Sequence, residues 1–252
     1  MQLQLIPDPA RIGAKVAADA ERILTDALAR QPEATLVAAT GMSQLAMLGL
    51  LAQSRRIDWR RVTVFHLDEY IGLPASHRAS FRRYLRERFL DHLPAQPAFF
   101  GIQGDAPDLD AEIARLNQAL GARPVDLCFA GLGDNAHLAF NDPPADFDAE
   151  APYIAVALDE TCRQQQTGQG WFDRVEDVPP RAISMSVRQI LRSRCLLMTV
   201  TGQRKAPAVR GMVEGPIDPS CPASALQRHP QCTVYLDPAA ASGLREPPTA
   251  AR

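Results

Sequence analysis

The chain has 252 residues, of which 46% are hydrophobic and 22% charged, as in a folded globular protein. It carries 27 Lys and Arg residues against 29 Asp and Glu residues, and this net charge of −2 argues against sequence-independent binding of nucleic acid. No stretch reaches about 18 consecutive apolar residues, and no basic segment followed by an apolar block opens the chain. We therefore expect neither a membrane span nor a secretory signal.

The cysteines favour a reduced, cytoplasmic protein. Their number is odd and no two are spaced C-x-x-C, so neither a disulfide framework nor a cysteine zinc site is expected. There is no nucleotide or flavin signature either, and we predict that the protein needs no metal and no cofactor. The five are Cys128, Cys162, Cys195, Cys221 and Cys232.

Strand-like and helix-like segments alternate along the chain. Asp8 and Pro9 are typical of a helix N-cap and first turn, and apolar residues at helical spacing follow as far as residue 28. This alternation predicts an α/β fold with a mainly parallel sheet, in one domain over residues 1–252 with a frayed tail from about residue 240. Further helices are predicted at residues 43–51, 81–89, 111–120, 204–213 and 223–229. Strands are predicted at residues 36–39, 62–67, 99–102, 125–130, 153–158, 182–187, 195–200 and 232–236.

Small and polar residues follow several predicted strands, at the edge where parallel sheets bind their ligands. Thr40, Gly41, Met42 and Ser43 lie between a strand and a helix, so their backbone N–H groups can attract an anion. The alternative is an ordinary tight turn with Ser43 as its N-cap. Lys205 opens a later helix and is a second candidate for binding a phosphate, although lysines are common on surfaces.

Acidic residues follow the strand at residues 62–67. If that strand continues, alternation puts His66 and Asp68 on one side and Glu69 on the other. Proton transfer and metal binding are the functional interpretations, and an acidic loop that caps the next helix is the structural one. Because only two of these side chains share a side, we do not expect them to hold a metal.

Arginines crowd the helix predicted at residues 81–89 and the loop before it. We interpret them as a basic surface or as a subunit contact in a homo-oligomer, and the alternative is steering of an anionic substrate. They are Arg78, Arg82, Arg83, Arg86 and Arg88.

His137 is one of five histidines, and it follows a glycine-rich loop that starts at residue 131. An imidazole held by a carboxylate is a good proton carrier near neutral pH. The alternative is a buried structural histidine.

Two long motifs together resemble the signatures of glucosamine-6-phosphate deaminases. The first is residues 64–74, VFHLDEYIGLP, and the second is residues 131–143, GLGDNAHLAFNDP. The Thr40-Gly41 loop and residues 202–205 fit the same family in the same order, and the resemblance covers about residues 5–236. The sister family, the 6-phosphogluconolactonases, shares the fold but lacks the Phe-Asn-acid-Pro ending of the second motif.

The resemblance implies a three-layer α/β/α sandwich with a Rossmann-like sheet, and an aldose–ketose isomerisation that converts glucosamine 6-phosphate to fructose 6-phosphate and ammonia. Asp68 would be the base that moves a proton between C2 and C1, and His137 the acid–base group that opens the sugar ring. Asp142 stands where the family has a glutamate that supports this histidine, and Asn135 where it has an aspartate. The phosphate of this amino-sugar substrate would be bound by Thr40, Gly41, Met42, Ser43 and Lys205.

The sequence departs from the family pattern around its histidine. Asn135 can orient a group but cannot offset a positive charge, and Ala136 replaces a glycine where a positive φ would cost roughly 1 kcal/mol or more. Arg163 is the nearest candidate for the family's phosphate-binding arginine, but it is out of register. Three alternatives therefore stay open: lactone hydrolysis of the 6-phosphogluconolactonase type, a galactosamine-6-phosphate isomerase, and a weakly catalytic sugar-phosphate sensor. Retention of Asp68 and His137 argues against a pure sensor.

Overall fold

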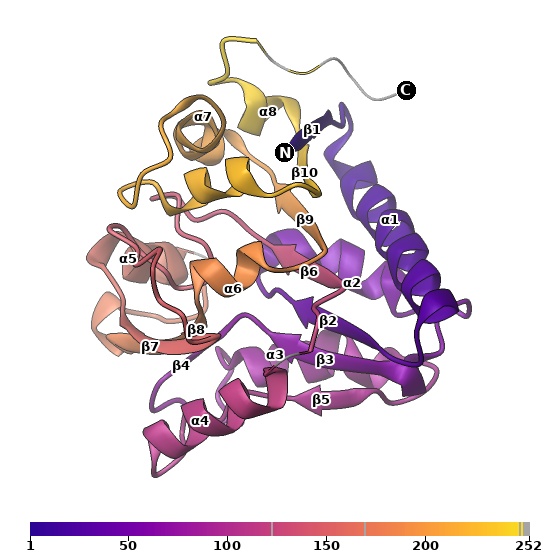
Figure 1. Cartoon of the computed structure of the whole chain (residues 1–252). Helices are drawn as coiled ribbons and strands as arrows, with labels where there is room; N and C mark the ends of the chain where they lie inside the picture. The colour runs from indigo at the N-terminus through magenta and orange to yellow at the C-terminus, as the bar shows by residue number, and fades with distance from the viewer. Residues whose placement is uncertain (122, 169, 247, 249–252) are drawn as a thin grey trace.

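The computed structural model describes residues 1–121, 123–168, 170–246 and 248, and its centre is a seven-stranded sheet (Figure 1). All neighbouring strands of this sheet are parallel, in the order β1-β10-β9-β6-β2-β3-β5. The strands are β1 (Gln2–Leu5), β2 (Ala34–Ala38), β3 (Val62–His66), β5 (Ala98–Phe100), β6 (Leu127–Ala130), β9 (Cys195–Val200) and β10 (Cys232–Leu236). A smaller antiparallel sheet contains β4 (Asp68–Tyr70), β8 (Arg181–Met185) and β7 (Tyr153–Ala157), in that order.

Helices flank the large sheet on both faces and complete a three-layer α/β/α fold. One set is α1 (Pro9–Arg30), α2 (Leu45–Leu51) and α3 (Phe81–Arg88), and it connects strands in the direction from β1 towards β5. The other set is α4 (Leu109–Leu120), α5 (Glu160–Gly168), α6 (Val187–Leu191) and α7 (Ala206–Glu214), and its connections run back from β5 towards β10. Because crossovers are right-handed, the two sets lie on opposite faces, and Figure 1 shows α1 on the right and α5, α6 and α7 on the left. The predicted fold class is confirmed.

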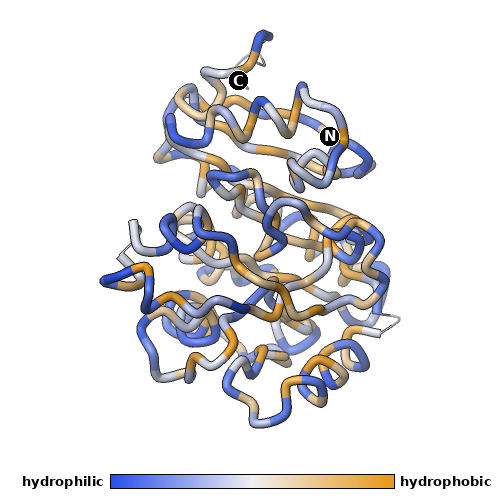
Figure 2. The backbone as a smooth tube through the Cα atoms, turned by 90° about the vertical axis from the view of Figure 1, so that its left-hand side faces the viewer, coloured by the Kyte–Doolittle hydropathy of each residue, from blue (hydrophilic) through white to orange (hydrophobic). Residues whose placement is uncertain are grey.

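Local sequence signals account for the main elements. Asp8 accepts a hydrogen bond from the backbone N of Ala10 at 3.0 Å, and Pro9 occupies the first turn of α1, as predicted. Every residue of β2, β3 and β6 is buried, which explains why these strands are nearly continuous apolar runs. Hydrophobic and hydrophilic residues alternate within single helices (Figure 2), as expected where only one face is buried. Within the described ranges, none of the helices has both the length and the apolar character that crossing a membrane requires.

Some of the predicted elements differ in the structure. Residues 223–229 were expected as an ordinary helix, but Pro222–Arg228 form a 3₁₀ helix. The start of the predicted tail packs against the core, because α8 (Pro238–Ala241) buries Ala240 and Ala241, and Leu244 is buried as well. The end of the predicted tail, residues 247 and 249–252, lies outside the described residues. The sequence patterns also missed β1, an edge strand of only four residues.

The predicted strand at residues 62–67 ends earlier, and the chain changes sheets there. β3 stops at His66, and Asp68 pairs with Ser184 of β8 in the antiparallel sheet. The condition for placing His66 and Asp68 on one side, a strand that continues past His66, is therefore not met. The break carries Asp68 beyond the carboxyl end of β3.

Four neighbouring strands bring the predicted polar loops together. β9, β6, β2 and β3 are consecutive in the sheet and all parallel, so their carboxyl ends lie side by side. From β2 the chain adds strands towards one edge of the sheet, β3 and then β5. From β6 it adds them towards the other edge, β9 and then β10, so the direction of strand addition reverses between β2 and β6. Such a switch point is the usual ligand site of an open α/β sheet.

Candidate active site

A cavity of about 220 Å³ lies at this switch point. Its lining includes Asp68 after β3, His137 after β6 and Lys205 after β9. The structure therefore brings together the residues that the sequence singled out at separate places. The lining contributed by the loop after β2 is Thr40, Gly41, Met42 and Ser43.

The loop after β2 has the geometry of an anion-binding turn. Gly41 has a φ of 104°, a conformation that glycine adopts without strain, and it leads into a 3₁₀ turn, Met42–Gln44. Ser43 is not the N-cap, because no side chain caps this turn and the Ser43 hydroxyl instead accepts a hydrogen bond from Gln44 Nε2 at 3.1 Å. The backbone N of Gln44 donates to the carbonyl of Gly41 at 3.1 Å, and the N–H groups before it in the loop are left for an anion.

Lys205 completes this side of the cavity. Its Nζ lies 2.6 Å from Asp134 Oδ1, and Arg204 Nη2 donates to Asp134 Oδ2 at 2.8 Å. Burial lowers the pKa of Lys205, and the hydrogen bond and charge of Asp134 oppose this effect. Asp134 thus holds the ammonium group of Lys205 at the wall of the cavity, where it can bind an anion.

Asp68 is suited to act as a base. Its side chain is buried, and this burial, with the charge of Glu69 as a second cause, raises its pKa well above the usual value. A carboxylate with a raised pKa is a stronger base at neutral pH than an ordinary aspartate. The structure places Asp68, but not Glu69, in the lining of the cavity.

Glu69 has a structural task. Its carboxylate accepts hydrogen bonds from Ser80 Oγ at 2.8 Å and from the backbone N of Phe81 and Arg82 at 3.1 and 2.9 Å. These donors are at the start of α3, so Glu69 caps that helix, which was the structural interpretation of the acidic loop.

His66 also lies apart from the cavity lining. Its Nε2 accepts a hydrogen bond from the backbone N of Ile102 at 2.8 Å. Burial, with the charge of Arg82 as a second cause, lowers the pKa of His66 to about 3, so the ring is neutral at physiological pH. His66 therefore packs as a structural histidine beneath the loop after β5.

Three of the five arginines in and before α3 pair with carboxylates of the same chain. Arg82 lies 2.7 Å from Asp105, Arg83 lies 2.7 Å from Glu87, and Arg78 lies 2.6 Å from Asp173. This pairing fits the interpretation of a basic surface better than the steering of substrate.

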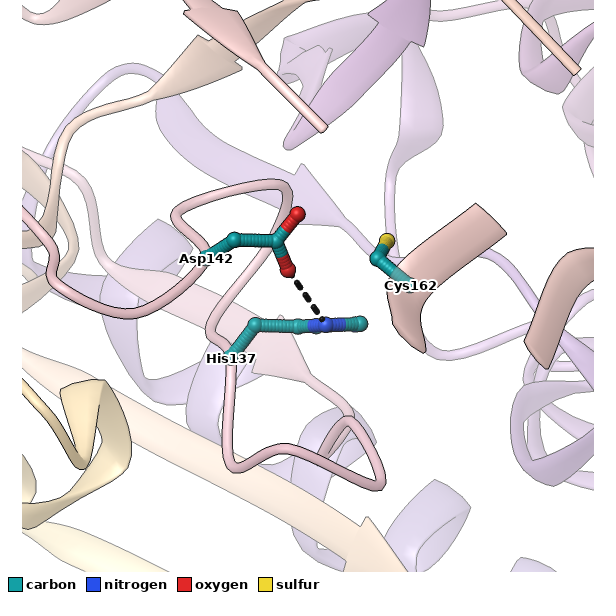
Figure 3. Close-up of side chains that lie close together, drawn as sticks. All are labelled: His137, Asp142 and Cys162. Atoms are coloured by element: carbon teal, nitrogen blue, oxygen red, sulfur yellow. Dashed lines mark ion pairs between the residues drawn. The ribbon is translucent and has the colours of Figure 1, made fainter. Parts of the chain in front are cut away.

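The imidazole of His137 is held by the carboxylate of Asp142 (Figure 3). Its Nδ1 lies 3.0 Å from Asp142 Oδ1, which leaves Nε2 for a ligand. Asp142 also accepts hydrogen bonds from Asn135 Nδ2 at 3.0 Å and from the backbone N of Asp159 at 2.9 Å. Burial by itself would raise the pKa of Asp142, but the hydrogen bond and charge of His137, followed by the other two donors, lower it below its usual value. Asp142 is therefore an ionised partner that orients the imidazole.

The loop before His137 is shaped to present the ring. A Cβ at Gly133 would lie 2.4 Å from His137 Cγ and Nδ1, so only glycine lets the ring pack this closely. Ala136 has a φ of 66°, as its replacement of a glycine suggested. Its backbone N donates to the carbonyl of Gly133 at 3.1 Å and closes a tight turn.

His137, Asp142 and Cys162 offer three atoms of the kinds that bind zinc, all within 4.8 Å of one another (Figure 3). In the structure, however, both oxygens of Asp142 already accept hydrogen bonds, from Asn135 and from Asp159. The grouping is therefore accounted for by the network that orients His137.

Helix α5 and the segment after it supply lining residues that sequence reasoning missed. Gln165, Gln166 and Trp171 line the cavity, whereas Arg163 does not and instead donates to the carbonyl of Val175 at 2.7 Å. Cys162 and Gln166 are four residues apart and share the buried face of α5, while Arg163 lies about 100° further round the helix. This helical spacing was the signal that could have identified Gln166. The structure does not bring the predicted Arg163 to the site.

Comparison with known proteins identifies similar sequences and similar folds. A glucosamine-6-phosphate deaminase of Exiguobacterium sp. is 39% identical over 237 residues, which are 92% of this chain and 91% of the relative. One of Bacillus thuringiensis is 36% identical over 223 residues, 88% of this chain and 82% of the relative.

Among solved structures, a monomeric glucosamine-6-phosphate deaminase superposes with a TM-score of 0.87 at 32% identity, covering 97% of this chain and 100% of the other. A 6-phosphogluconolactonase of Shewanella baltica shares the fold, with a TM-score of 0.78 at 21% identity over 94% of this chain and 97% of the other. The family model of glucosamine-6-phosphate isomerases and 6-phosphogluconolactonases matches residues 7–235. With this match and with relatives at 36% to 39% identity over most of its length, the chain belongs to that family.

Proposed function

We propose that the protein converts glucosamine 6-phosphate to fructose 6-phosphate and ammonia by aldose–ketose isomerisation. The observation that supports this most is the shared cavity, in which Asp68 and His137 lie together with an anion-binding turn and Lys205. A base, a proton shuttle and a phosphate site in one cavity are the groups that this reaction needs.

The phosphate site positions the substrate. Backbone N–H groups of the turn at Gly41 and Ser43 and the ammonium group of Lys205 bind the phosphate, and the sugar extends from there towards Asp68 and His137. Binding energy gained at the phosphate then holds the reacting carbons in place, which is a large part of such catalysis.

His137 opens the sugar ring. Its Nε2 exchanges protons with the ring oxygen and the hydroxyl on C1, so the closed sugar becomes the open aldehyde. Asp142 keeps Nδ1 directed away from the substrate and stabilises the imidazolium when it forms.

Asp68 then performs the isomerisation. Its carboxylate removes the proton from C2 while the aldehyde oxygen on C1 takes a proton from water, which gives an enol with the amino group still on C2. Asp68 returns a proton to C1, the C2 centre becomes an imine, and addition of water releases ammonia and leaves the ketone. The raised pKa of Asp68 suits both halves of this transfer.

Lactone hydrolysis is the less favoured function. It needs no base at C2, so it does not account for a buried carboxylate with a raised pKa in the cavity. The relatives that match at 36% to 39% identity are deaminases, whereas the 6-phosphogluconolactonase of Shewanella baltica at 21% identity supports a common fold alone.

Product analysis in deuterated water tests the proposal. Wild-type protein should release ammonia from glucosamine 6-phosphate and place deuterium at C1 of the product, unless internal transfer outpaces exchange with solvent. A parallel assay with galactosamine 6-phosphate tests the epimer preference. Hydrolysis of a sugar-phosphate lactone without any exchange at carbon would instead support the lactonase function, and binding without turnover a sensor.

We also propose a cytoplasmic location. All five cysteines are free thiols, and Cys128, Cys162 and Cys232 are buried. Reduced thiols are typical of proteins in that compartment.

A further inference from the structure

Asn135 joins two carboxylates behind the imidazole of His137. Its Nδ2 lies 3.0 Å from Asp142 Oδ1 and 2.9 Å from Asp159 Oδ2. Its Oδ1 accepts a hydrogen bond from the backbone N of His137 at 3.2 Å. Exchanging the amide oxygen and nitrogen would turn all three contacts repulsive, so the network fixes the orientation of this side chain.

Asp159 is tied to the same network a second time. Its backbone N donates to Asp142 Oδ2 at 2.9 Å, while its Oδ1 accepts from the backbone N of Cys162 at 2.6 Å. The second bond caps the first turn of α5. The carboxylate of Asp159 is therefore held in one position, with one oxygen on the helix and the other on Asn135.

We propose that Asp159 is a positioning residue for His137: through Asn135 it adds a second negative charge behind the imidazole, which stabilises the imidazolium. This inference rests on the proposed role of His137 in ring opening. An aspartate at residue 135 could donate to neither carboxylate, so Asn135 is the residue that allows Asp142 and Asp159 to lie side by side. Asparagine cannot offset a positive charge, but the acid that it holds can.

The other titratable groups near this network have separate partners or stay uncharged. Asp134 is paired with Lys205 and Arg204. Burial, followed by the charges of Asp142 and Asp159, raises the pKa of the Cys162 thiol, so it stays protonated. Asp68 lies in β4 of the antiparallel sheet and contributes to the cavity lining rather than to this network. Asp142 and Asp159 therefore supply the charge behind His137.

Asp159→Asn and Asp159→Ser test the inference directly. Both remove the charge, and Ser keeps an oxygen that can cap α5. NMR titration of the His137 imidazole, assigned with His137→Asn, should shift to lower pH in both variants, because the imidazolium loses a nearby negative charge. For closed-ring substrate, kcat should fall about tenfold, while KM changes less than about threefold because the phosphate site is elsewhere.

The matched control is Asp108→Ser. Asp108 caps α4 in the same way, with its Oδ1 accepting from the backbone N of Ala111 at 2.9 Å, but it is remote from the cavity lining. A purely structural cap at Asp159 would lower the melting temperature as Asp108→Ser does and leave the titration of His137 unchanged. An unchanged imidazole pKa in both Asp159 variants overturns the proposal.

A double variant tests the link through residue 135. Asn135→Asp alone removes the donor between the two acids and should lower kcat. In Asn135→Asp with Asp159→Asn, the new amide at 159 can donate to the new carboxylate at 135, so activity should exceed that of Asn135→Asp alone. Strictly additive losses would show that the two positions act independently.

The titration needs no substrate, so the two proposals can fail separately. Absence of ammonia release by wild-type protein would reject the proposed function, and the NMR measurement would still decide whether Asp159 acts on His137.

Discussion

Replacing Gly133 by alanine should disable proton transfer by His137 without weakening the phosphate site. The new Cβ would lie 2.4 Å from two atoms of the imidazole, whereas ordinary contact begins at 3.4 Å, so the ring has to move by about 1 Å. One of these atoms, Nδ1, lies 3.0 Å from Asp142 Oδ1, so a shift of this size disturbs the contact that orients the ring. A misplacement of about 1 Å can cost on the order of 100-fold in rate.

We therefore expect kcat for ammonia release to fall about 100-fold in Gly133→Ala, with KM changed only a few-fold. Gly49→Ala is the matched control, because a Cβ there meets nothing within 4 Å and the residue lies inside α2. It should keep wild-type kcat and gain roughly 0.5–1 kcal/mol of stability from its better helix propensity. A kcat for Gly133→Ala within threefold of wild type would show that the position of the His137 ring does not limit turnover.

Three further predictions follow from the same geometry. Asp142→Asn should lower kcat by about 10²–10⁴-fold, because the imidazole loses its ionised partner, while substrate binding measured by calorimetry changes much less; unaltered turnover would remove Asp142 from the mechanism. Ala136→Gly should raise the free energy of unfolding in urea by up to about 1 kcal/mol, because it relieves a φ of 66°, and a loss of stability would contradict this reasoning. The pKa of Asp68 is raised in the folded state and ordinary in the unfolded state. Between these two pKa values the folded state binds a proton that the unfolded state has released, so the free energy of unfolding falls as the pH rises through that window. Asp68→Asn should therefore melt at a higher temperature than wild type at pH 7. The difference in melting temperature should vanish at a pH below the ordinary pKa of aspartate, and equal melting temperatures at both pH values would refute this explanation.

The sequence motifs identified most of the polar residues that line the cavity. Small and polar residues after strands marked the turn at Gly41 and the loop before His137, because such residues are unusual at the end of an apolar strand unless backbone or polar groups must meet a ligand there. Parallel strands direct their carboxyl ends to one edge, so residues as distant as Asp68 and Lys205 could be expected together. The prediction that Arg163 binds the phosphate was not confirmed. Its side chain lies outside the cavity lining because of its angle around α5.

The sequence by itself determined the α/β class and the candidate acid–base residues, since hydrophobic periodicity and the two long motifs are local properties of the chain. Only the tertiary structure decided which carboxylate lines the cavity and which one caps a helix. The sheet change after His66 separates Asp68 from its neighbours, with Glu69 capping α3 and Asp68 lining the cavity. The partnership of Asn135 with Asp159 was likewise invisible, because the two residues are 24 positions apart and meet only when the start of α5 packs on the His137 loop. Hydrogen bonds between distant segments depend on the packing of whole elements, and no local pattern encodes that packing.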